Sequence, residues 1–230
     1  MQHQQEGIDW RDGDVPVSTR FDDPYFSLED GLAETRHVFL AGNDLPARFR
    51  DGFHIAELGF GTGLNLLAAL HAWRAAAVPG RLVYTSFEAF PMPPQDMRRA
   101  QSRFAELDTL AAELAPHWTG GAQRIALSDL DFTLVAGDAR ETLSHWQKKA
   151  NTWFLDGFSP AKNPELWQPD LMAEVARHTA PGGTTATYTA AGFVRRGLEA
   201  AGFSVSRVPG YGRKRHMTRA TLAPEKPERP

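Results

Sequence analysis

Short apolar runs alternate with helical patterns along most of the chain. The runs are rich in β-branched and aromatic residues, as buried strands are, and they occupy residues 53–58, 82–88, 132–137, 152–156, 184–189 and 203–208. Apolar positions recur with the helical period in the stretches between them, at 64–77, 94–115, 140–148, 164–178 and 190–201, and we expect a break within 94–115. Strands that alternate with helices predict an α/β fold with a mostly parallel sheet covered on both faces.

Both ends of the chain depart from this alternation. Residues 203–222 leave no room for a helix between two strands, so we expect a terminal antiparallel hairpin and seven strands in all. Residues 1–50 are predicted to form a small strand-and-helix extension of the domain at 51–222. The charged, proline-rich segment 223–230 is predicted to be a linker-like or disordered tail. Pro-Gly-Gly at 181–183 is expected to end a helix before the next strand.

Composition narrows the class of protein. The 230 residues are 42% hydrophobic and 23% charged, which is typical of a chain with a substantial core. They include no cysteine, which excludes a disulfide framework, cysteine-ligated zinc and a thiol nucleophile. The histidines lack the spacing of metal ligands, so no metal is expected. We find no basic apolar leader and no membrane-length apolar run, and therefore predict a soluble, cytoplasmic protein without a membrane partner.

Charge is unevenly distributed. The net charge is −3, yet residues 186–220 hold seven Lys and Arg against one acid. We expect five of these cations to surround a pocket and bind nucleic-acid phosphates: Arg195, Arg196, Arg213, Lys214 and Arg215. Phe158, Trp167 or Tyr211 could then stack on an unpaired base. The alternative is an ordinary solvated hairpin.

A glycine-rich loop, AELGFGTGLN at 56–65, follows the first predicted strand and opens the first helix. Such a loop brings backbone N–H groups close to a ligand. Leu64 stands where the dinucleotide fingerprint needs glycine, and the Lys-Ser/Thr pair of a phosphate-binding P-loop is missing. Glu57 would repel a pyrophosphate but suits a ligand that carries an ammonium and a sulfonium group. That ligand is S-adenosylmethionine.

Two further acids end successive predicted strands. Glu88 is placed to accept the hydroxyls of a ribose, and Asp138 to accept an adenine amine. The alternatives are that Glu57 is an ordinary residue at the edge of the sheet, that Glu88 is a solvated acid and that Asp138 caps the next helix.

Asp156 ends the fourth predicted strand, in TWFLDGFSPAKNP at 152–164. Carboxyl ends of parallel strands meet at one edge of a sheet, so Asp156 is expected to face the same pocket. Methyl transfer to an amine places positive charge on nitrogen, which a fixed carboxylate stabilises. We expect Asp156 to orient the amine and stabilise this charge rather than act as a strong base, with Phe158 as an aromatic wall. The alternative is a carboxylate that caps a turn.

Several motifs along residues 10–220 resemble the methyltransferase half of the MnmC family. They are FDDPYFS, VFLAGNDLPARF, ELGFGTGLN, SFEAFP, WFLDGFSPAKNPELW, TAAGFVRRGL and GYGRKRHM. The resemblance implies a class I, Rossmann-like S-adenosylmethionine-dependent methyltransferase that acts on an aminomethyl group of uridine 34 in the tRNA anticodon stem-loop. It implies Asp156 and Phe158 at the acceptor amine. Its implied cofactor contacts are Glu57, Gly59, Phe60, Gly61, Thr62, Gly63, Asn65, Glu88, Asp138 and Ala139.

The chain departs from the two-domain members of that family, which continue into an FAD-dependent oxidase. It carries no FAD fingerprint, so we expect no flavin and no oxidase activity from this chain, with the oxidase as a tethered or separate partner. Two other functions stay open: a small-molecule N- or O-methyltransferase, and a catalytically silent RNA-binding domain on the same scaffold.

Overall fold

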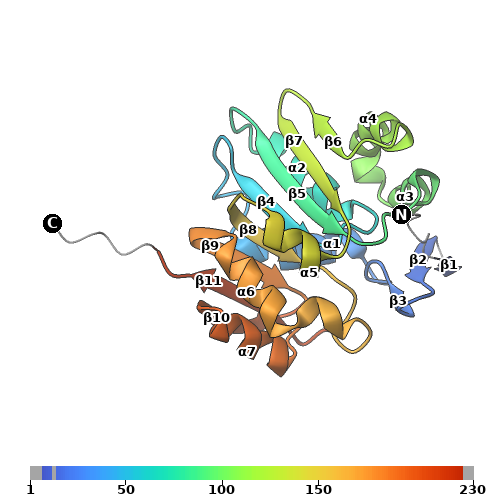
Figure 1. Ribbon diagram of the computed structural model, residues 1–230. Helices are drawn as coiled ribbons and strands as arrows, with labels where there is room; N and C mark the ends of the chain where they lie inside the picture. The colour runs from blue at the N-terminus through green and yellow to red at the C-terminus, as the bar shows by residue number, and fades with distance from the viewer. Residues whose placement is uncertain (1–6, 12–13, 225–230) are drawn as a thin grey trace.

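A sheet of eight strands forms the centre of the molecule in the computed structural model, which describes residues 7–11 and 14–224 (Figure 1). The strands, in spatial order, are β10 (Phe203–Pro209), β11 (His216–Leu222), β9 (Thr179–Thr187), β8 (Ala150–Leu155), β4 (His54–Leu58), β5 (Leu82–Glu88), β7 (Leu130–Ala136) and β6 (Arg124–Ala126). The pairings from β9 through β8, β4 and β5 to β7 are parallel. Strand β11 is antiparallel to both of its neighbours, so β10 runs in the same direction as β9. The α/β prediction and the terminal hairpin are confirmed.

The sheet differs from the predicted one in two details. It has eight strands rather than seven, because the short β6 pairs with the edge of β7 and is too brief to show a strand pattern in the sequence. Residues 181–183 lie inside β9 rather than ending a helix. The pairing of β9 with β8 shifts register here, and Gly182 takes a φ of 71°, as a bulge in a strand allows.

Helices cover both faces of the sheet. One face carries α2 (Leu64–Ala75), α3 (Pro94–Gln101), the 3₁₀ turn η3 (Ala105–Leu107) and α4 (Asp108–Thr119). The other carries α5 (Ala139–Thr142), η4 (Leu143–His145), α6 (Pro169–Arg177) and α7 (Gly192–Ala200), with η5 (Pro164–Trp167) before α6. The break expected within 94–115 is confirmed, because α3 and α4 are separate helices, whereas the stretch predicted at 140–148 is one short helix and a turn.

Alternating side chains of the central strands form two separate cores. Ile55 and Phe154 point into the core beneath α2, whereas Leu58, Trp153 and Leu155 point into the core beneath α6. All five are fully buried. A parallel strand that is buried on both faces reads as a continuous apolar run, which is why these strands were visible in the sequence.

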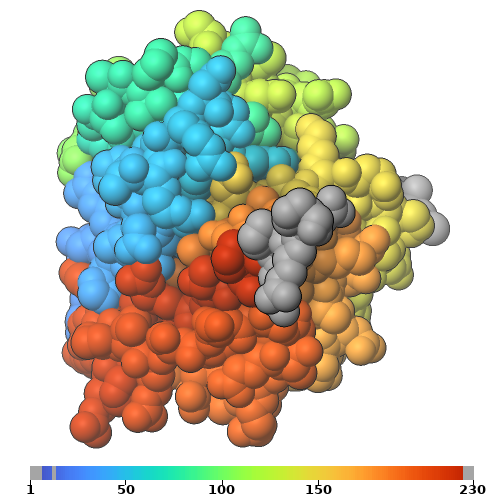
Figure 2. Space-filling view, turned by 90° about the vertical axis from the view of Figure 1, so that its left-hand side faces the viewer, coloured from blue at the N-terminus to red at the C-terminus, as the bar shows by residue number. Residues whose placement is uncertain are grey.

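The N-terminal extension consists of a small antiparallel sheet and a run of helical turns. Its elements are β1 (Ile8–Arg11), β2 (Val15–Ser18), β3 (Asp23–Pro24), α1 (Gly31–Thr35), the π-helical turn η1 (Arg36–Leu40) and η2 (Ala41–Asn43). Arg219 of β11 pairs with Asp44 at 2.7 Å, and the Arg48 guanidinium donates to Thr184 of β9 at 2.5 Å. Figure 2 shows this blue N-terminal part lying directly against the orange and red C-terminal part. The extension and the main sheet are thus packed together, whereas the tail predicted at 223–230 lies mostly outside the described residues.

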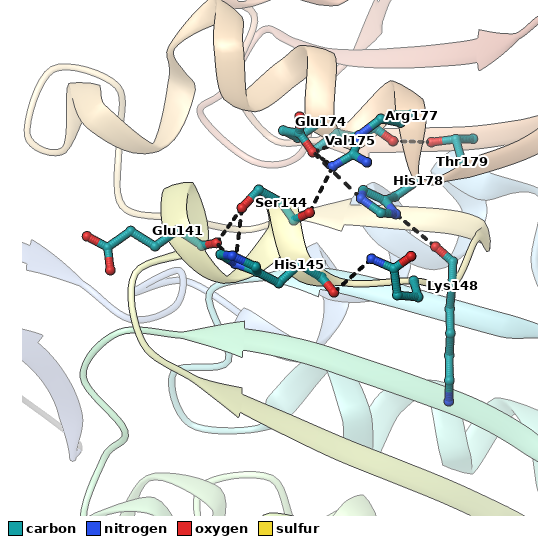
Figure 3. A network of polar contacts seen from close by, with 10 residues as sticks. Glu141, Ser144, His145, Lys148, Glu174, Val175, Arg177, His178 and Thr179 are labelled. Carbon is teal, nitrogen blue, oxygen red and sulfur yellow. Dashed lines mark hydrogen bonds and ion pairs between the residues drawn. The ribbon is translucent and has the colours of Figure 1, made fainter.

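A polar network joins η4 to α6 at the amino ends of β8 and β9 (Figure 3). Arg177 donates to the Ser144 carbonyl at 3.2 Å and also binds the Glu174 carboxylate. The buried His178 ring contacts the Lys148 carbonyl through Nδ1 at 2.9 Å. The network lies at the end of the sheet opposite the carboxyl ends of the strands, so its role is to hold these elements together. Among the described residues, no helix combines the length and apolarity that crossing a bilayer requires.

Candidate functional site

A cavity of about 1000 Å³ opens at the carboxyl ends of the parallel strands. It is lined by the glycine loop, by the ends of β5, β7 and β8, by residues 20–35 and by the loop between β10 and β11. The predicted residues that line it are Gly59, Phe60, Gly61, Thr62, Asn65, Glu88, Asp138, Ala139, Asp156, Phe158, Arg213 and Lys214. The parallel topology therefore brings together most of the residues that the sequence singled out.

The glycine loop passes very close to Asp156. Gly59 has a φ of 89°, and a Cβ atom at this position would lie 2.6 Å from the Asp156 carbonyl oxygen. Gly61 and Gly63 also have positive φ angles, of 51° and 74°. Only glycine gives this loop both its left-handed conformation and its close approach to the neighbouring strand end.

Glu88 holds the glycine loop in place. Its Oε2 accepts the N–H groups of Phe60 at 2.9 Å and Gly61 at 3.1 Å, and its Oε1 accepts the N–H of Phe90 at 2.8 Å. Glu88 lies on the cavity wall, so its predicted contact with a ribose is compatible with the structure. The same carboxylate also fixes the conformation of the glycine loop. Carboxylate oxygens have lone pairs left for further donors.

Asn65 connects two carboxyl groups. Its Nδ2 donates to Asp156 Oδ2 at 2.6 Å and to Glu57 Oε1 at 2.8 Å. The Thr35 hydroxyl donates to Asn65 Oδ1 at 2.9 Å, and this bond fixes which end of the amide faces the acids. Asn65 therefore orients Asp156 toward the cavity.

Glu57 lies beneath the loop rather than on the cavity wall. It is fully buried, and its Oε2 accepts a hydrogen bond from Ser86 at 2.7 Å. Burial raises the pKa of Glu57 to about 8, although Ser86 and Asn65 oppose the shift. Gly63 is likewise absent from the wall. Direct contact of these two residues with a ligand stays a prediction, and the structure gives Glu57 an indirect connection to the site through Asn65.

Asp156 is the acid with the most unusual environment on the cavity wall. Burial, followed by the nearby Glu57 carboxyl, raises the pKa of Asp156 well above its usual range. The Asn65 hydrogen bond and the Lys214 ammonium act in the opposite direction. A carboxyl group with a raised pKa loses its proton most readily when a cation lies beside it.

Asp138 serves as the N-cap of α5, which was the alternative interpretation of this residue. Its Oδ1 accepts the Arg140 N–H at 2.9 Å, and its Oδ2 lies 2.5 Å from the Arg140 guanidinium. Arg140 lowers the pKa of the Asp138 carboxyl and keeps it ionised. Asp138 lines the cavity all the same, so its adenine contact stays a prediction.

The N-terminal extension supplies a wall that sequence reasoning missed. The Phe21 ring stacks on Phe158 with centroids 4.8 Å apart, and Tyr25 packs edge-on against Phe158 at 5.0 Å. Asp23 Oδ2 accepts the Ser159 N–H at 2.7 Å. The only signal in the sequence was the resemblance of FDDPYFS, which gave no indication that this segment contacts the loop after Asp156.

The predicted basic residues divide into two groups. Arg213 and Lys214 reach the mouth of the cavity, but each is paired with an acid of the extension, Glu29 at 2.7 Å and Glu34 at 2.8 Å. Arg195, Arg196 and Arg215 do not line the cavity, so the prediction that they surround it is wrong. Arg195 and Arg196 lie on α7, which packs beside α6 on one face of the sheet, and Arg215 directly precedes β11.

Part of this second group lies beside His216. Desolvation and the positive charges of Arg207, Arg215 and Arg195 lower the pKa of His216. Close spacing of like charges indicates an electropositive patch, here around His216, which follows the hairpin loop whose residues Tyr211, Arg213 and Lys214 line the cavity.

The three candidate stacking residues also differ in position. Trp167 is buried at 1% exposure and its indole N–H donates to the Phe158 carbonyl at 2.9 Å, so it supports the loop and has no face free for a base. Phe158 and Tyr211 both line the cavity. No group of three or more His, Asp or Glu in the described part of the chain is arranged to hold a metal ion.

Several known proteins are similar to this chain. Residues 105–223 match a family described as S-adenosyl-L-methionine-dependent methyltransferase. The tRNA 5-methylaminomethyl-2-thiouridine biosynthesis bifunctional protein MnmC of Caulobacter sp. (strain K31) is 47% identical over 238 residues, covering 96% of this chain and 40% of that protein. The protein of the same name from Stutzerimonas stutzeri (strain A1501) is 46% identical, covering 95% of this chain and 35% of its own length. The chain thus spans well under half the length of these relatives.

Solved structures share the fold. MnmC2 from Aquifex aeolicus matches with a TM-score of 0.74 at 24% identity, covering 98% of this chain and 74% of that one. Precorrin-6y C5,15-methyltransferase from Geobacter metallireducens GS-15 matches with a TM-score of 0.52 at 15% identity, covering 96% of this chain and all of the other. Structural similarity at this level of sequence identity shows the fold alone.

Proposed function

Because the chain belongs to the S-adenosyl-L-methionine-dependent methyltransferase family, we propose that it methylates the amine of 5-aminomethyluridine, with or without 2-thiolation, at wobble position 34 of tRNA. The product is the corresponding 5-methylaminomethyluridine. The observation that carries the proposal is the position of Asp156, which Asn65 holds on the wall of the same cavity as the glycine loop. The names of the relatives that match almost the whole of this chain support the choice of substrate.

The cavity suits S-adenosylmethionine in size and chemistry. About 1000 Å³ is at the upper end for small-molecule sites and leaves room for a nucleoside cofactor and an acceptor group together. The glycine loop and Asn65 would hold the methionine part, Glu88 the ribose hydroxyls, and Asp138 with Ala139 the adenine. When bound, the cofactor supplies a methyl group on a positively charged sulfur.

Asp156 has the central role at the acceptor. As the new C–N bond forms, positive charge develops on the substrate nitrogen, and a carboxylate held beside it stabilises that charge in a site with little water. Asn65 keeps one Asp156 oxygen engaged, which leaves the other for the amine. Phe158, covered by Phe21 on one face, gives this part of the cavity an apolar side that excludes water.

The environment of Asp156 also bears on the proton that the amine must lose. An ordinary carboxylate is a weak acceptor for the proton of an alkylammonium ion. The pKa of Asp156 is raised by burial and by Glu57, which makes this carboxylate a better proton acceptor than an exposed one. We therefore extend its role from orientation and charge stabilisation to acceptance of this proton, which it can pass to solvent through the cavity mouth.

The tRNA anticodon stem-loop is the proposed macromolecular partner. The patch of Arg195, Arg207 and Arg215 lies around His216, directly after the loop that lines the cavity, and suits phosphate groups on either side of an extruded wobble base. A flavin-dependent oxidase, tethered or separate, is the proposed partner that delivers the aminomethyl substrate, since the relatives are bifunctional and much longer than this chain.

The test is methyl transfer from labelled S-adenosylmethionine to tRNA that carries the aminomethyl group, with tRNA lacking that group as the control. Asp156→Asn should lower kcat by about two orders of magnitude or more, the usual effect of removing one electrostatic partner of a transition state. Its cofactor affinity, measured by calorimetry, should stay within about threefold of the wild-type value. Equal labelling of both tRNAs would overturn the substrate assignment, and a large loss of cofactor affinity would move Asp156 to another subsite.

A further inference from the structure

A cation supplied by the chain itself occupies the acceptor end of the cavity. Lys214 Nζ lies 2.8 Å from Glu34 Oε1 and 4.0 Å from the centroid of the Tyr188 ring. A carboxylate beside an aromatic face is a common way to bind an alkylammonium group. The Lys214 ammonium thus marks a position whose surroundings suit a primary amine in its protonated form.

The two groups that hold this ammonium are themselves fixed. Glu34 belongs to α1, and its side chain is only 11% exposed. The Tyr188 hydroxyl donates to the Gly157 carbonyl at 2.8 Å, so the ring cannot turn away from the cavity. This bond also places Tyr188 against the residue that follows Asp156.

Lys214, in contrast, is attached to a peripheral element. It lies in the loop between β10 and β11, and its side chain is 44% exposed. An internal cation on an exposed loop can leave, whereas the buried Glu34 carboxylate cannot, and a buried carboxylate without a partner is costly. A second cation that takes the place of Lys214 would keep the Glu34 carboxylate paired.

We propose that Glu34 and the Tyr188 ring form a subsite for the aminomethyl group of the substrate, which binds as a primary alkylammonium ion in the place of Lys214 Nζ. This inference rests on the proposed function and adds the acceptor contacts that it lacked. Asp156, Glu34 and Lys214 line the same cavity, and Tyr188 bonds the residue that follows Asp156, so an amine in this subsite shares that cavity with the acid assigned to the reaction. Lys214 then acts as an occupant that keeps the subsite paired until substrate arrives.

The probes for the test are two nucleosides, 5-aminomethyluridine and its neutral analogue 5-hydroxymethyluridine. Their binding to the full chain, saturated with S-adenosylhomocysteine, is measured by calorimetry. We expect wild-type protein to prefer the amine, and Lys214→Met to bind the amine about tenfold more tightly because the internal competitor is gone. Affinity for the hydroxymethyl analogue should not change. Glu34→Gln should abolish the preference, and Tyr188→Leu should reduce it severalfold.

Lys162→Met is the matched control. Lys162 also lines the cavity, its side chain is also 44% exposed, and it pairs with Asp22 at 2.7 Å, but Asp22 is 70% exposed. This variant should bind both probes as wild type does. The proposal is overturned if Lys214→Met weakens the amine probe, or if folded Glu34→Gln, verified by thermal melting, still prefers the amine.

The two proposals fail separately. If the amine preference is present but aminomethyl tRNA is not methylated, the function is wrong and the subsite stands. If the tRNA is methylated while neither Lys214→Met nor Glu34→Gln changes the preference, the subsite is wrong and the function stands.

Discussion

At the scale of single residues, the site depends on close contacts that few side chains permit. Gly59 lets the loop after β4 touch the backbone at Asp156, and Asn65 uses both hydrogens of its amide on two acids. A buried carboxyl pair joined by one donor group is sensitive to any change in geometry or protonation. Two predictions belong to this scale.

Gly59→Ala should weaken cofactor binding strongly. The new methyl group would lie 2.6 Å from the Asp156 carbonyl oxygen, so the loop must move away from the strand end. We expect a loss of at least about tenfold in affinity for S-adenosylmethionine by calorimetry. Gly52→Ala is the control, because Gly52 has a similar positive φ of 68° with no atom within 4 Å of the added Cβ. It should cost only about 1 kcal/mol of stability and leave binding unchanged. Equal effects of the two variants would show that backbone strain alone is responsible.

Glu57 should make stability dependent on pH. The pKa of Glu57 is raised from 4.5 to about 8, so between these values the folded state holds a proton that the unfolded chain has lost. The free energy of unfolding should therefore fall as the pH rises through this window, by up to about 1.4 kcal/mol per pH unit. Glu57→Gln, which can accept from Asn65 and donate to Ser86, should flatten the profile and be more stable than wild type at pH 8.

Urea denaturation of wild type and Glu57→Gln at several pH values tests the predicted effect of Glu57 on stability. Glu113 is a control of opposite sign, because its hydrogen bond to Arg74 lowers the pKa of Glu113. Glu113→Gln should therefore lose stability above pH 4.5 and none in strong acid, where the carboxyl is protonated in both states. If the free energy of unfolding of Glu57→Gln varies with pH in parallel with that of wild type, Glu57 is ionised in the folded protein.

At the scale of elements, the cavity is closed by segments outside the central sheet. Residues 20–35 contact the loop after β8 through Phe21, Tyr25 and Asp23, and the loop between β10 and β11 through Glu29 and Glu34. Strands position the acids, while these segments determine how much of the cavity is open to water.

Asp23→Ala should loosen the loop at 157–163. It removes the acceptor of the Ser159 N–H, a partly buried hydrogen bond to a charged group that is worth about 1.5–3 kcal/mol. We expect hydrogen exchange in this loop to become at least about tenfold faster, and KM for tRNA to rise while cofactor affinity stays unchanged. Lys162→Met breaks the exposed ion pair between the same two segments and should have a much smaller effect. Similar exchange in both variants would contradict the role given to Asp23.

At the scale of the whole molecule, the basic residues proposed to bind tRNA gather toward one end of the sheet. Arg195, Arg207 and Arg215 lie around His216, directly after the loop that lines the cavity, while the network of Arg177 and Glu174 lies at the amino ends of β8 and β9 (Figure 3). This arrangement suits a protein that takes a large polyanion on one side and leaves the other side free.

Replacing Arg195, Arg207 and Arg215 together with Gln should weaken tRNA binding and lower its salt dependence. Removing one phosphate-binding cation reduces the slope of log K against log salt by about 0.7–0.9, so the decrease for all three should reach about 2–3. The control is the triple replacement of Arg50, Arg81 and Arg177, which carries the same change in charge and lies before the amino ends of β4, β5 and β9. For each triple variant, fluorescence anisotropy with an anticodon stem-loop at several salt concentrations measures the affinity and its dependence on salt. Equal slopes for the two triple variants would show that only net charge matters.

The sequence alone determined the parallel α/β architecture, the glycine loop, and the acids at the ends of β5, β7 and β8. These features were readable because burial on both faces leaves a continuous apolar run, and because strands that run in parallel must bring their carboxyl ends to one edge. The alternation failed where an element was too short, as in β6, or contained a bulge, as in β9, and it joined the short α5 and the turn η4 into one predicted helix.

Tertiary structure alone decided which of these groups face the cavity and what surrounds them. It placed Glu57 beneath Asn65, moved Arg195, Arg196 and Arg215 off the rim, and brought Lys214 to Glu34, 180 residues away in the chain. Local patterns report which way a side chain faces relative to its own strand or helix, and therefore predict elements well. They hold no information on the path of a loop or on which distant segment packs over it, because those follow from how the whole core closes.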